Sequence, residues 1–255
     1  MAKEKLSACM VLHRSGDDAL KAVACLEAAD ARVDVYIVDN ASSDGVAERI
    51  RWAHPGVQLR MQQKNLGFGR GNNAVLNELE SEYHLILNPD VTFAPELLTQ
   101  MMEYMDKHPN AVALTPRVFN EDGSEQFLPK QLPTVRYLLG GRLERLGGIF
   151  ANWRKEYTMA DKVIKVPVRV QFATGCFMLV RTEVFKRLGG FDKRFFLYQE
   201  DSDLSRRLSE IGPIIYHPDM HVTHAWKRDS AHSMQAILRH LWATIQYFAK
   251  WGLEW

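Results

Sequence analysis

The sequence has no long apolar run. None of its uninterrupted apolar stretches approaches the roughly 18 residues that a membrane-spanning helix needs. Its first residues, MAKEKLSACM, lack the pattern of a signal peptide. Cysteine is also scarce, because Cys9, Cys25 and Cys176 are the only ones and lie among apolar neighbours. We expect reduced core thiols in a cytoplasmic protein, since none of the three has the spacing of metal ligands.

Net charge is small as well. The chain has 32 Lys and Arg residues against 31 Asp and Glu residues, a formal charge of +1 that argues against a nucleic-acid partner. The segment 126–169 nevertheless holds nine basic and three acidic residues, an excess of six positive charges. Either this segment is a solvated surface excursion or it meets an anionic partner. Length and composition, with 46% hydrophobic residues, allow one large α/β domain or two small ones.

The first half of the chain alternates β-like runs with helical patterns. Strands are expected at 6–12, 33–38, 57–61, 84–87 and 111–114, and helices at 15–29, 44–53, 72–79 and 95–107. This alternation implies right-handed crossovers and a mostly parallel sheet. Ligands of such sheets collect beyond the carboxyl ends of the strands, so the residues that follow each strand are the informative ones.

Two of the turns after strands have polar or glycine-rich sequences. Asp39 ends the second strand and can hold a ribose or a base edge, although turns favour such residues in any case. The loop NLGFGRGNN, residues 65–73, has glycine at alternate positions, so its amides can approach an anion, unless it is simply a tight turn. Its spacing differs from the dinucleotide-binding fingerprint, and we predict no such cofactor.

Asn88-Pro89-Asp90 follows the strand 84–87. Proline stops the strand and keeps Asn88 extended, which places Asp90 at the carboxyl end of the strand. One carboxylate with open coordination suits a Mg²⁺ or Mn²⁺ ion that is otherwise held by diphosphate oxygens and water. The alternative is an acid in a surface turn.

A cluster of acids follows a run of aromatic residues. The apolar run 177–180 predicts a buried strand, and Glu200, Asp201 and Asp203 come where a helix is expected to begin. Acids in a first helical turn can simply complement the helix dipole. Desolvation by the preceding aromatic residues would raise the proton affinity of a carboxylate, which favours a general base.

Four motifs carry a resemblance to a known family. In chain order they are VDNASSDG, NLGFGRGNN, LILNPDV, and ATGCFMLVR followed by GGFDKRFFLYQEDSDLSRRL. They resemble family 2 glycosyltransferases of the GT-A fold, in the branch of bacterial rhamnosyltransferases that build cell-surface polysaccharides. The resemblance implies a Rossmann-like, mostly parallel sheet flanked by helices, with a basic acceptor-side insertion. It divides the chain into a nucleotide-binding half 1–115, an acceptor and catalytic half 116–232, and a C-terminal amphipathic helix 233–255.

The resemblance also implies roles for motif residues. Asp201 would be the catalytic base, with Glu200 and Asp203 orienting it or holding acceptor hydroxyls. Asp90 would contact the metal, and a downstream histidine would complete the metal site. The implied donor-binding residues are Asp39, Asn40, Asn65, Gly67, Arg70, Asn88 and Asp90.

Four histidines, at positions 217, 221, 224 and 232, are candidates for the metal site. Residues 220–224 predict a short strand, so His221 and His224 would face opposite sides and could not share one ion. We choose His224. Relatives usually have a glycine soon after this histidine, whereas Ala225 and Trp226 follow here.

The implied reaction moves L-rhamnose from dTDP-rhamnose to a lipid-linked saccharide, with inversion at the anomeric carbon and with Mn²⁺ or Mg²⁺. Alternatives are a UDP-hexose-dependent transferase of the same family and a non-catalytic nucleotide-sugar-binding subunit. A pair of carboxylates could also indicate a glycoside hydrolase, but a hydrolase needs neither a metal site nor a nucleotide pocket.

Residues 233–251 form the clearest amphipathic helix of the chain. Its apolar face consists of Met234, Ile237, Leu238, Leu241, Trp242, Ile245 and Phe248. This face could pack on its own domain, contact a membrane surface, or form a subunit interface such as that of a homodimer. A lipid-linked acceptor at a membrane would also suit the basic excess of 126–169.

Overall fold

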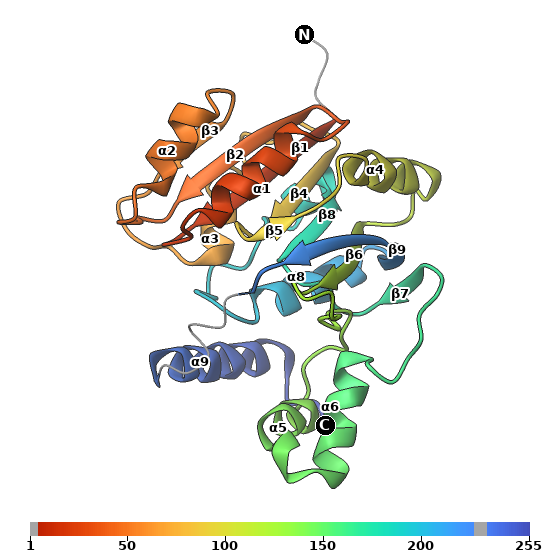
Figure 1. The fold of residues 1–255 in the computed structure, drawn as a ribbon. Coiled ribbons are helices and arrows are strands. Elements are labelled where there is room, and N and C mark those ends of the chain that lie inside the picture. Colours follow the sequence, from red (N-terminus) through yellow and green to blue (C-terminus); the bar gives the residue numbers. More distant parts are fainter. Residues whose placement is uncertain (1–4, 227–233) are drawn as a thin grey trace.

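The computed structural model describes residues 5–226 and 234–255. One nine-stranded sheet runs through the described chain in the order β3-β2-β1-β4-β8-β6-β9-β5, with β7 paired to β9 (Figure 1). Helices cover both of its faces. Side chains of α1, α2 and α4 join the core on one face, and side chains of α7 and α8 join the core on the other.

The N-terminal half is the parallel part of the sheet. Its strands are β1 (Leu6–Leu12), β2 (Val33–Asp39), β3 (Gln58–Met61) and β4 (Tyr83–Leu87). Its helices are α1 (Asp18–Glu27), α2 (Val46–Ala53) and α3 (Phe68–Asn73), and α4 (Leu97–Lys107) follows. β1 pairs in parallel with β2 and β4, and β2 with β3, as the alternation of strand and helix predicts.

The third helix differs from the prediction. It spans Phe68–Asn73, within the glycine-rich loop, whereas 74–79, expected to be helical, forms turns. Val75 and Leu79 are buried against the sheet without helical structure. Their apolar spacing therefore reflects packing against the sheet. It does not indicate the helix that was predicted at 72–79.

The C-terminal half is mixed in direction. β8 (Phe177–Arg181) lies between β4 and β6 (Ala113–Phe119) and is antiparallel to both. β9 (Ile214–His224) is parallel to β6 and antiparallel to β5 (Val91–Thr92) and β7 (Val168–Val170). The predicted parallel arrangement thus applies to the first four strands. α7 (Thr182–Arg187) and α8 (Glu200–Ser209) follow β8.

The basic insertion and the C-terminus form a separate layer of helices. α5 (Val135–Leu143) and α6 (Gly148–Thr158), joined by the short turn η1 (Glu144–Leu146), lie below the sheet beside α9 (Met234–Trp251) (Figure 1). A Cβ on Gly140 would come within 2.8 Å of the Cβ of Trp153, so this glycine allows α5 and α6 to pack closely. No helix within the described ranges is both long and apolar enough to cross a bilayer.

Candidate active site

Pairing of β4 with β8 brings two distant acids to the same rim of the sheet. The Asn88 amide donates to the Cys176 carbonyl over 2.8 Å, and Asp90 lies two residues further on. A Cβ on Gly175 would lie 3.8 Å from the Cβ of Asp201. Burial raises the pKa of the Cys176 thiol to about 12, and the nearby charges of Asp90 and Asp201 also raise it. The two acids therefore flank one buried thiol.

Asp90 and His224 lie side by side. The strand pair β5–β9 sets Val91 opposite His224, and the Asp90 Oδ1 to His224 Nε2 distance is 3.2 Å. The Asn88 side-chain amide lies 3.3 Å from the same Nε2. Adjacent ligands of an octahedral ion are about 3 Å apart, given metal–oxygen distances of about 2.1 Å. The spacing of this pair therefore fits two positions of one divalent ion.

A glutamine orients the His224 ring. The Gln126 amide nitrogen donates to the Asn120 side-chain oxygen and to the His224 carbonyl, each over 2.8 Å. Its oxygen consequently faces His224 Nδ1, 3.0 Å away, and accepts the proton of that nitrogen. In the neutral ring Nε2 then has the lone pair, which lies toward Asp90. The Nε2 lone pair and the Asp90 carboxylate thus face each other, an arrangement that a bound cation would stabilise.

Three or more metal-binding side chains do not converge anywhere in the described ranges. A divalent ion at Asp90 and His224 would therefore take its remaining ligands from substrate and water. This is the coordination that Mg²⁺ and Mn²⁺ use with nucleotide diphosphates, and the pair fits such a site.

Glu200 and Asp201 differ in their surroundings. Glu200 is 5% exposed, and its Oε2 has no hydrogen-bond partner. Burial raises its pKa to about 8, with a further contribution from the Asp201 charge. Burial also raises the pKa of Asp201, but Lys130 and the amides of Ser202 and Gly175 favour its anion. A carboxylate with a cation close by is the better candidate for a base, which favours Asp201.

The turn before α8 aims these acids. Tyr198 and Gln199 have φ angles of 72° and 64°, in the left-handed region that side chains other than glycine rarely adopt. Gln199 is the N-cap residue of α8, and its buried Oε1 has no partner. Backbone strain of this kind concentrates at functional sites. Here it starts α8 at Glu200, so that Glu200 and Asp201 lie at the rim of the sheet.

Lys130 was not predicted as a site residue from the sequence. It forms an isolated bridge with Phe172, and its ammonium lies 5.5 Å from the Phe172 ring centre and 5.9 Å from that of Tyr157. Burial lowers its pKa, and the nearby Asp201 charge opposes that shift. Only the basic excess of its segment pointed toward it. No local motif indicated a position beside Asp201.

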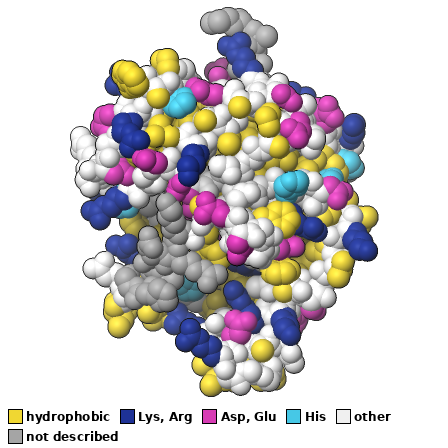
Figure 2. Space-filling model, viewed as in Figure 1, with side chains coloured by type: hydrophobic (Ala, Val, Ile, Leu, Met, Phe, Trp, Pro, Cys, Tyr) yellow, Lys and Arg dark blue, Asp and Glu magenta, His cyan; other side chains and the backbone are white. Residues whose placement is uncertain are grey.

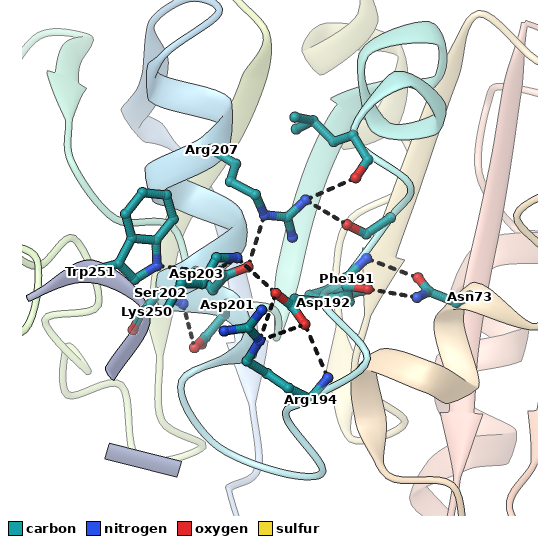
Figure 3. Close-up of polar contacts among 12 residues, drawn as sticks. Asn73, Phe191, Asp192, Arg194, Asp201, Ser202, Asp203, Arg207, Lys250 and Trp251 are labelled. Carbon is teal, nitrogen blue, oxygen red and sulfur yellow. Dashed lines mark hydrogen bonds and ion pairs between the residues drawn. The ribbon is translucent and has the colours of Figure 1, made fainter. Parts of the chain in front are cut away.

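Asp203 has a different place from the predicted one. It is 0% exposed and lies between Arg207 of α8 and Lys250 and Trp251 of α9 (Figure 3). Arg207 Nε donates to one oxygen over 2.8 Å, while Lys250 and Trp251 Nε1 donate to the other. An acceptor hydroxyl cannot reach these oxygens. The prediction that Asp203 holds acceptor hydroxyls is therefore wrong, and the residue fastens α9 to α8.

The turn after β2 connects three segments. One Asp39 oxygen accepts from the Ser42 amide over 3.1 Å, and the other is buried without a partner. The Asn40 side chain donates to the Gly67 carbonyl over 3.0 Å, and the Asn40 carbonyl lies 3.2 Å from His13 Nδ1. Asp39 thus offers an unsatisfied acceptor, while Asn40 joins this turn to the glycine loop.

The glycine loop is shaped by packing. Gly67 has a φ of 84°, and a Cβ there would clash with the Phe196 carbonyl oxygen. Asn65 accepts from the Gly67 amide over 2.8 Å, and Arg70 Nε donates to the Lys193 carbonyl over 2.7 Å. Glycine is therefore required for contact with the aromatic loop before α8. The structure gives no separate indication of an anion at this loop.

The other histidines lie apart from Asp90. On β9, His221 is exposed and His224 is buried, as expected for residues on opposite faces. His217 packs edge-on against Tyr104 of α4. His232 lies outside the described residues. Of the described candidates, only His224 pairs with Asp90.

Comparisons with known proteins agree with this architecture. The sequence model of Glycosyl transferase family 2 matches residues 7–189. The N-acetylglucosaminyl-diphospho-decaprenol L-rhamnosyltransferase of Mycobacterium tuberculosis is 29% identical over 222 residues, covering 80% of this chain and 71% of its own. Rhamnosyltransferase WbbL of Escherichia coli is 26% identical over 257 aligned positions, covering 94% of this chain and 91% of its own.

Solved structures show the same fold at low identity. The mannosyltransferase PcManGT of Pyrobaculum calidifontis, in complex with GDP-Man and Mn²⁺, superimposes with a TM-score of 0.64 at 18% identity. The match covers 98% of this chain and 64% of that one. GalNAc-T7 with UDP, GalNAc and Mn²⁺ gives a TM-score of 0.63 at 14% identity, covering 87% and 43%. This chain thus spans less than two thirds of either solved chain.

The fold is that of the GT-A enzymes, and the two related sequences named above are rhamnosyltransferases. Because the family model spans most of the chain, including the rim that carries Asp90, this protein belongs to glycosyl transferase family 2.

Proposed function

We propose that this chain is a metal-dependent, inverting rhamnosyltransferase. It would move L-rhamnose from dTDP-rhamnose to a lipid-linked saccharide during synthesis of a bacterial surface polysaccharide. The observation that carries the proposal is the convergence of Asp201 with the Asp90–His224 pair on one rim of the sheet. The choice of rhamnose and of a lipid-linked acceptor is supported by the names of the related sequences.

In this proposal Asp201 is the base. An acceptor hydroxyl gives its proton to Asp201 while its oxygen attacks the anomeric carbon from the face opposite the diphosphate, which inverts the configuration. Lys130 and backbone amides favour the anionic form of Asp201, against the effect of burial, which raises its pKa. Glu200 remains protonated and adds no second negative charge beside it. Holding both substrates in line supplies proximity.

Asp90 and His224 would hold the divalent ion, Mn²⁺ or Mg²⁺. When bound, such an ion neutralises negative charge on the departing nucleoside diphosphate. Gln126 contributes by fixing the His224 ring with Nε2 toward Asp90. The nucleoside would lie against the turn of Asp39, whose buried oxygen lacks a partner. The remaining proposed donor contacts are Asn40, Asn65, Gly67, Arg70 and Asn88.

We assign donor binding to residues 1–115 and acceptor binding and catalysis to 116–232. The C-terminal segment 233–255, which contains α9, would attach the enzyme to the cytoplasmic face of the cell membrane. This attachment is supported by the exposure of most of the apolar face of α9, whereas the residues buried against the protein are Ala236, Ala243 and Tyr247. The same face could join two copies in a homodimer. A non-catalytic nucleotide-sugar-binding subunit is less well supported, because pure binding needs no base.

The donor can be tested by thermal shift with dTDP-rhamnose, UDP-glucose and GDP-mannose, each with and without Mn²⁺. We expect stabilisation that rises with concentration for dTDP-rhamnose and depends on Mn²⁺. Asp90→Ala should remove the Mn²⁺ dependence and leave the ligand-free melting temperature near that of the parent. A response to UDP-glucose alone would replace the proposal by the UDP-hexose alternative. Mn²⁺-dependent binding that persists in Asp90→Ala would exclude the metal assignment.

A further inference from the structure

A cavity lies beside the rim, between the sheet and the helices α5, α6 and α9. Its volume is about 560 Å³, and it is walled by α5, α6, α9 and the turn before α8. Gln199, the residue before Glu200, lines it. Lys130 and Tyr157 also line it, and both lie close enough to Asp201 for its charge to act on them. The cavity therefore lies beside the residue that we propose as the base.

Three cations line this cavity: Lys130, Arg142 and Arg154. Across residues 5–226 and 234–255, neither Lys130 nor Arg142 has a carboxylate within ion-pair distance, and Arg154 has only Glu144, at 3.8 Å. In Figure 2 several Lys and Arg side chains gather over the lower helices. We call this lining the cationic cavity.

Other polar atoms of the cavity also lack partners. Gln199 Oε1 and His240 Nδ1 are buried without a hydrogen bond. The positive charges of Arg142 and Lys130 lower the pKa of His240 further, after the larger effect of burial. Buried polar atoms without partners are costly unless a ligand completes them, and the cations beside them attract negative charge. An anion with several oxygen acceptors would do so.

The cationic cavity continues into an apolar groove. Leu138, Arg142 and His240 line both spaces. The groove has a volume of about 160 Å³, and its other lining residues are Val135, Leu139, Leu241, Thr244 and Phe248. Beyond it lies the outer face of α9, where Leu238 is 57% exposed and Trp242 is 60% exposed. Along one direction the surface thus changes from carboxylate to cations and then to apolar side chains.

A lipid-diphosphate saccharide has the same order of chemical groups. We propose that the cationic cavity is the diphosphate subsite for such an acceptor, in which Lys130, Arg142 and Arg154 contact the diphosphate. The saccharide then lies toward Asp201, and the first lipid units lie in the apolar groove. The remaining lipid stays in the membrane surface that the outer face of α9 enters. Placing the saccharide at Asp201 rests on the function proposed above, whereas the anion site does not.

The donor is another source of diphosphate, but the fold separates its nucleoside end from this cavity. The turns assigned to the nucleoside follow β2 and β3, at one end of the strand order. The cationic cavity belongs to the helices of the basic insertion and α9. A nucleoside diphosphate also has no apolar chain that would occupy the groove. These observations favour the acceptor.

Calorimetric titration of the full chain can test the subsite, using farnesyl diphosphate as the probe. We expect Lys130→Met and Arg142→Gln each to raise its Kd by about tenfold or more, as for loss of a hydrogen bond to a charged group. Matched controls are Lys155→Met on α6 and Arg145→Gln on η1, both exposed and outside the cavity lining. These should stay within about twofold of the parent, and melting temperatures verify folding of all four variants.

The same titrations with dTDP in the presence of Mn²⁺ distinguish the sources. Unchanged dTDP affinity in Lys130→Met and Arg142→Gln supports an acceptor subsite, and equal weakening of both ligands assigns the cavity to the donor and overturns the inference. Farnesyl diphosphate that binds all variants alike, or that fails to bind the parent, also overturns it. If Lys130-dependent binding is found but dTDP-rhamnose is not used, the subsite stands and the proposed function fails.

Discussion

Two sides of the first turn of α8 carry the same kind of side chain with opposite consequences. Asp201 faces the rim and is partly exposed, with Lys130 and backbone amides near its carboxylate. Asp203 faces α9, and Arg207, Lys250 and Trp251 saturate both of its oxygens. A carboxylate that keeps spare acceptor capacity can react, whereas one enclosed by cations can only hold structure. Position on the helix decides the role, because residues two apart point in different directions.

We expect the largest effect, a loss of activity, from substitution of Asp201. Asp201→Asn should lower kcat by about 10²–10⁴-fold, because the amide cannot accept the proton of the acceptor. Donor affinity and melting temperature should remain close to those of the parent. Initial-rate measurements with a radiolabelled sugar nucleotide would check this. Transfer at the parental rate would remove Asp201 from the role of base.

On the other side of the helix, Asp203→Asn should act on stability. It leaves Lys250 and Arg207 without their shared anion in a largely buried place, at a cost of about 3–5 kcal/mol. Urea unfolding would measure the loss. Glu210→Gln, an exposed acid directly after α8, is the control and should change the free energy of unfolding by less than about 0.5 kcal/mol. If Asp203→Asn behaved like this control, the anchoring role would be disproved.

A third acid of this turn, Glu200, should make the free energy of unfolding depend on pH. Its carboxyl ionises near pH 4.5 in a free chain and near pH 8 in the fold. Between these values the folded state keeps a proton that the unfolded state has lost, so the free energy of unfolding falls as pH rises through this window. Glu200→Gln lacks this loss. It should be more stable than the parent by up to about 5 kcal/mol at pH 9, and the gain should disappear below pH 4.5.

Unfolding curves for both proteins across that range would measure this gain. A difference in stability that does not vary with pH would mean that burial does not keep Glu200 protonated in the folded state.

We expect the smallest effect, on membrane binding, from the exposed apolar face of α9. Trp242→Glu should weaken binding to vesicles containing anionic phospholipid by about fivefold, since it places a charge within an exposed apolar face. Trp52→Glu is the matched control, because Trp52 is 89% exposed on α2. Co-sedimentation with vesicles would compare the two. Equal binding of both variants and the parent would indicate another partner for α9, such as a second copy.

Much of the fold was predictable from local pattern. The strand predicted at 6–12 has those bounds, because it is a continuous run of buried side chains. The pairing of Asp90 with His224 agrees with the choice of that histidine. The direction of β8 was not predictable, because an apolar run carries no information about its neighbours. The prediction of a helix at 72–79 was wrong, because close packing rather than helical periodicity explains the buried residues of this segment.

Within the candidate site, local pattern was enough to find the acids at strand ends and helix starts. Asp90 and Glu200–Asp201 follow from chain order and turn chemistry alone. Which carboxylates meet cations depends instead on contacts between distant segments. Lys130 beside Asp201 and Lys250 at Asp203 come from segments about 71 and 47 residues away in the chain. Electrostatic environment depends on distance in space, and sequence separation carries no measure of it.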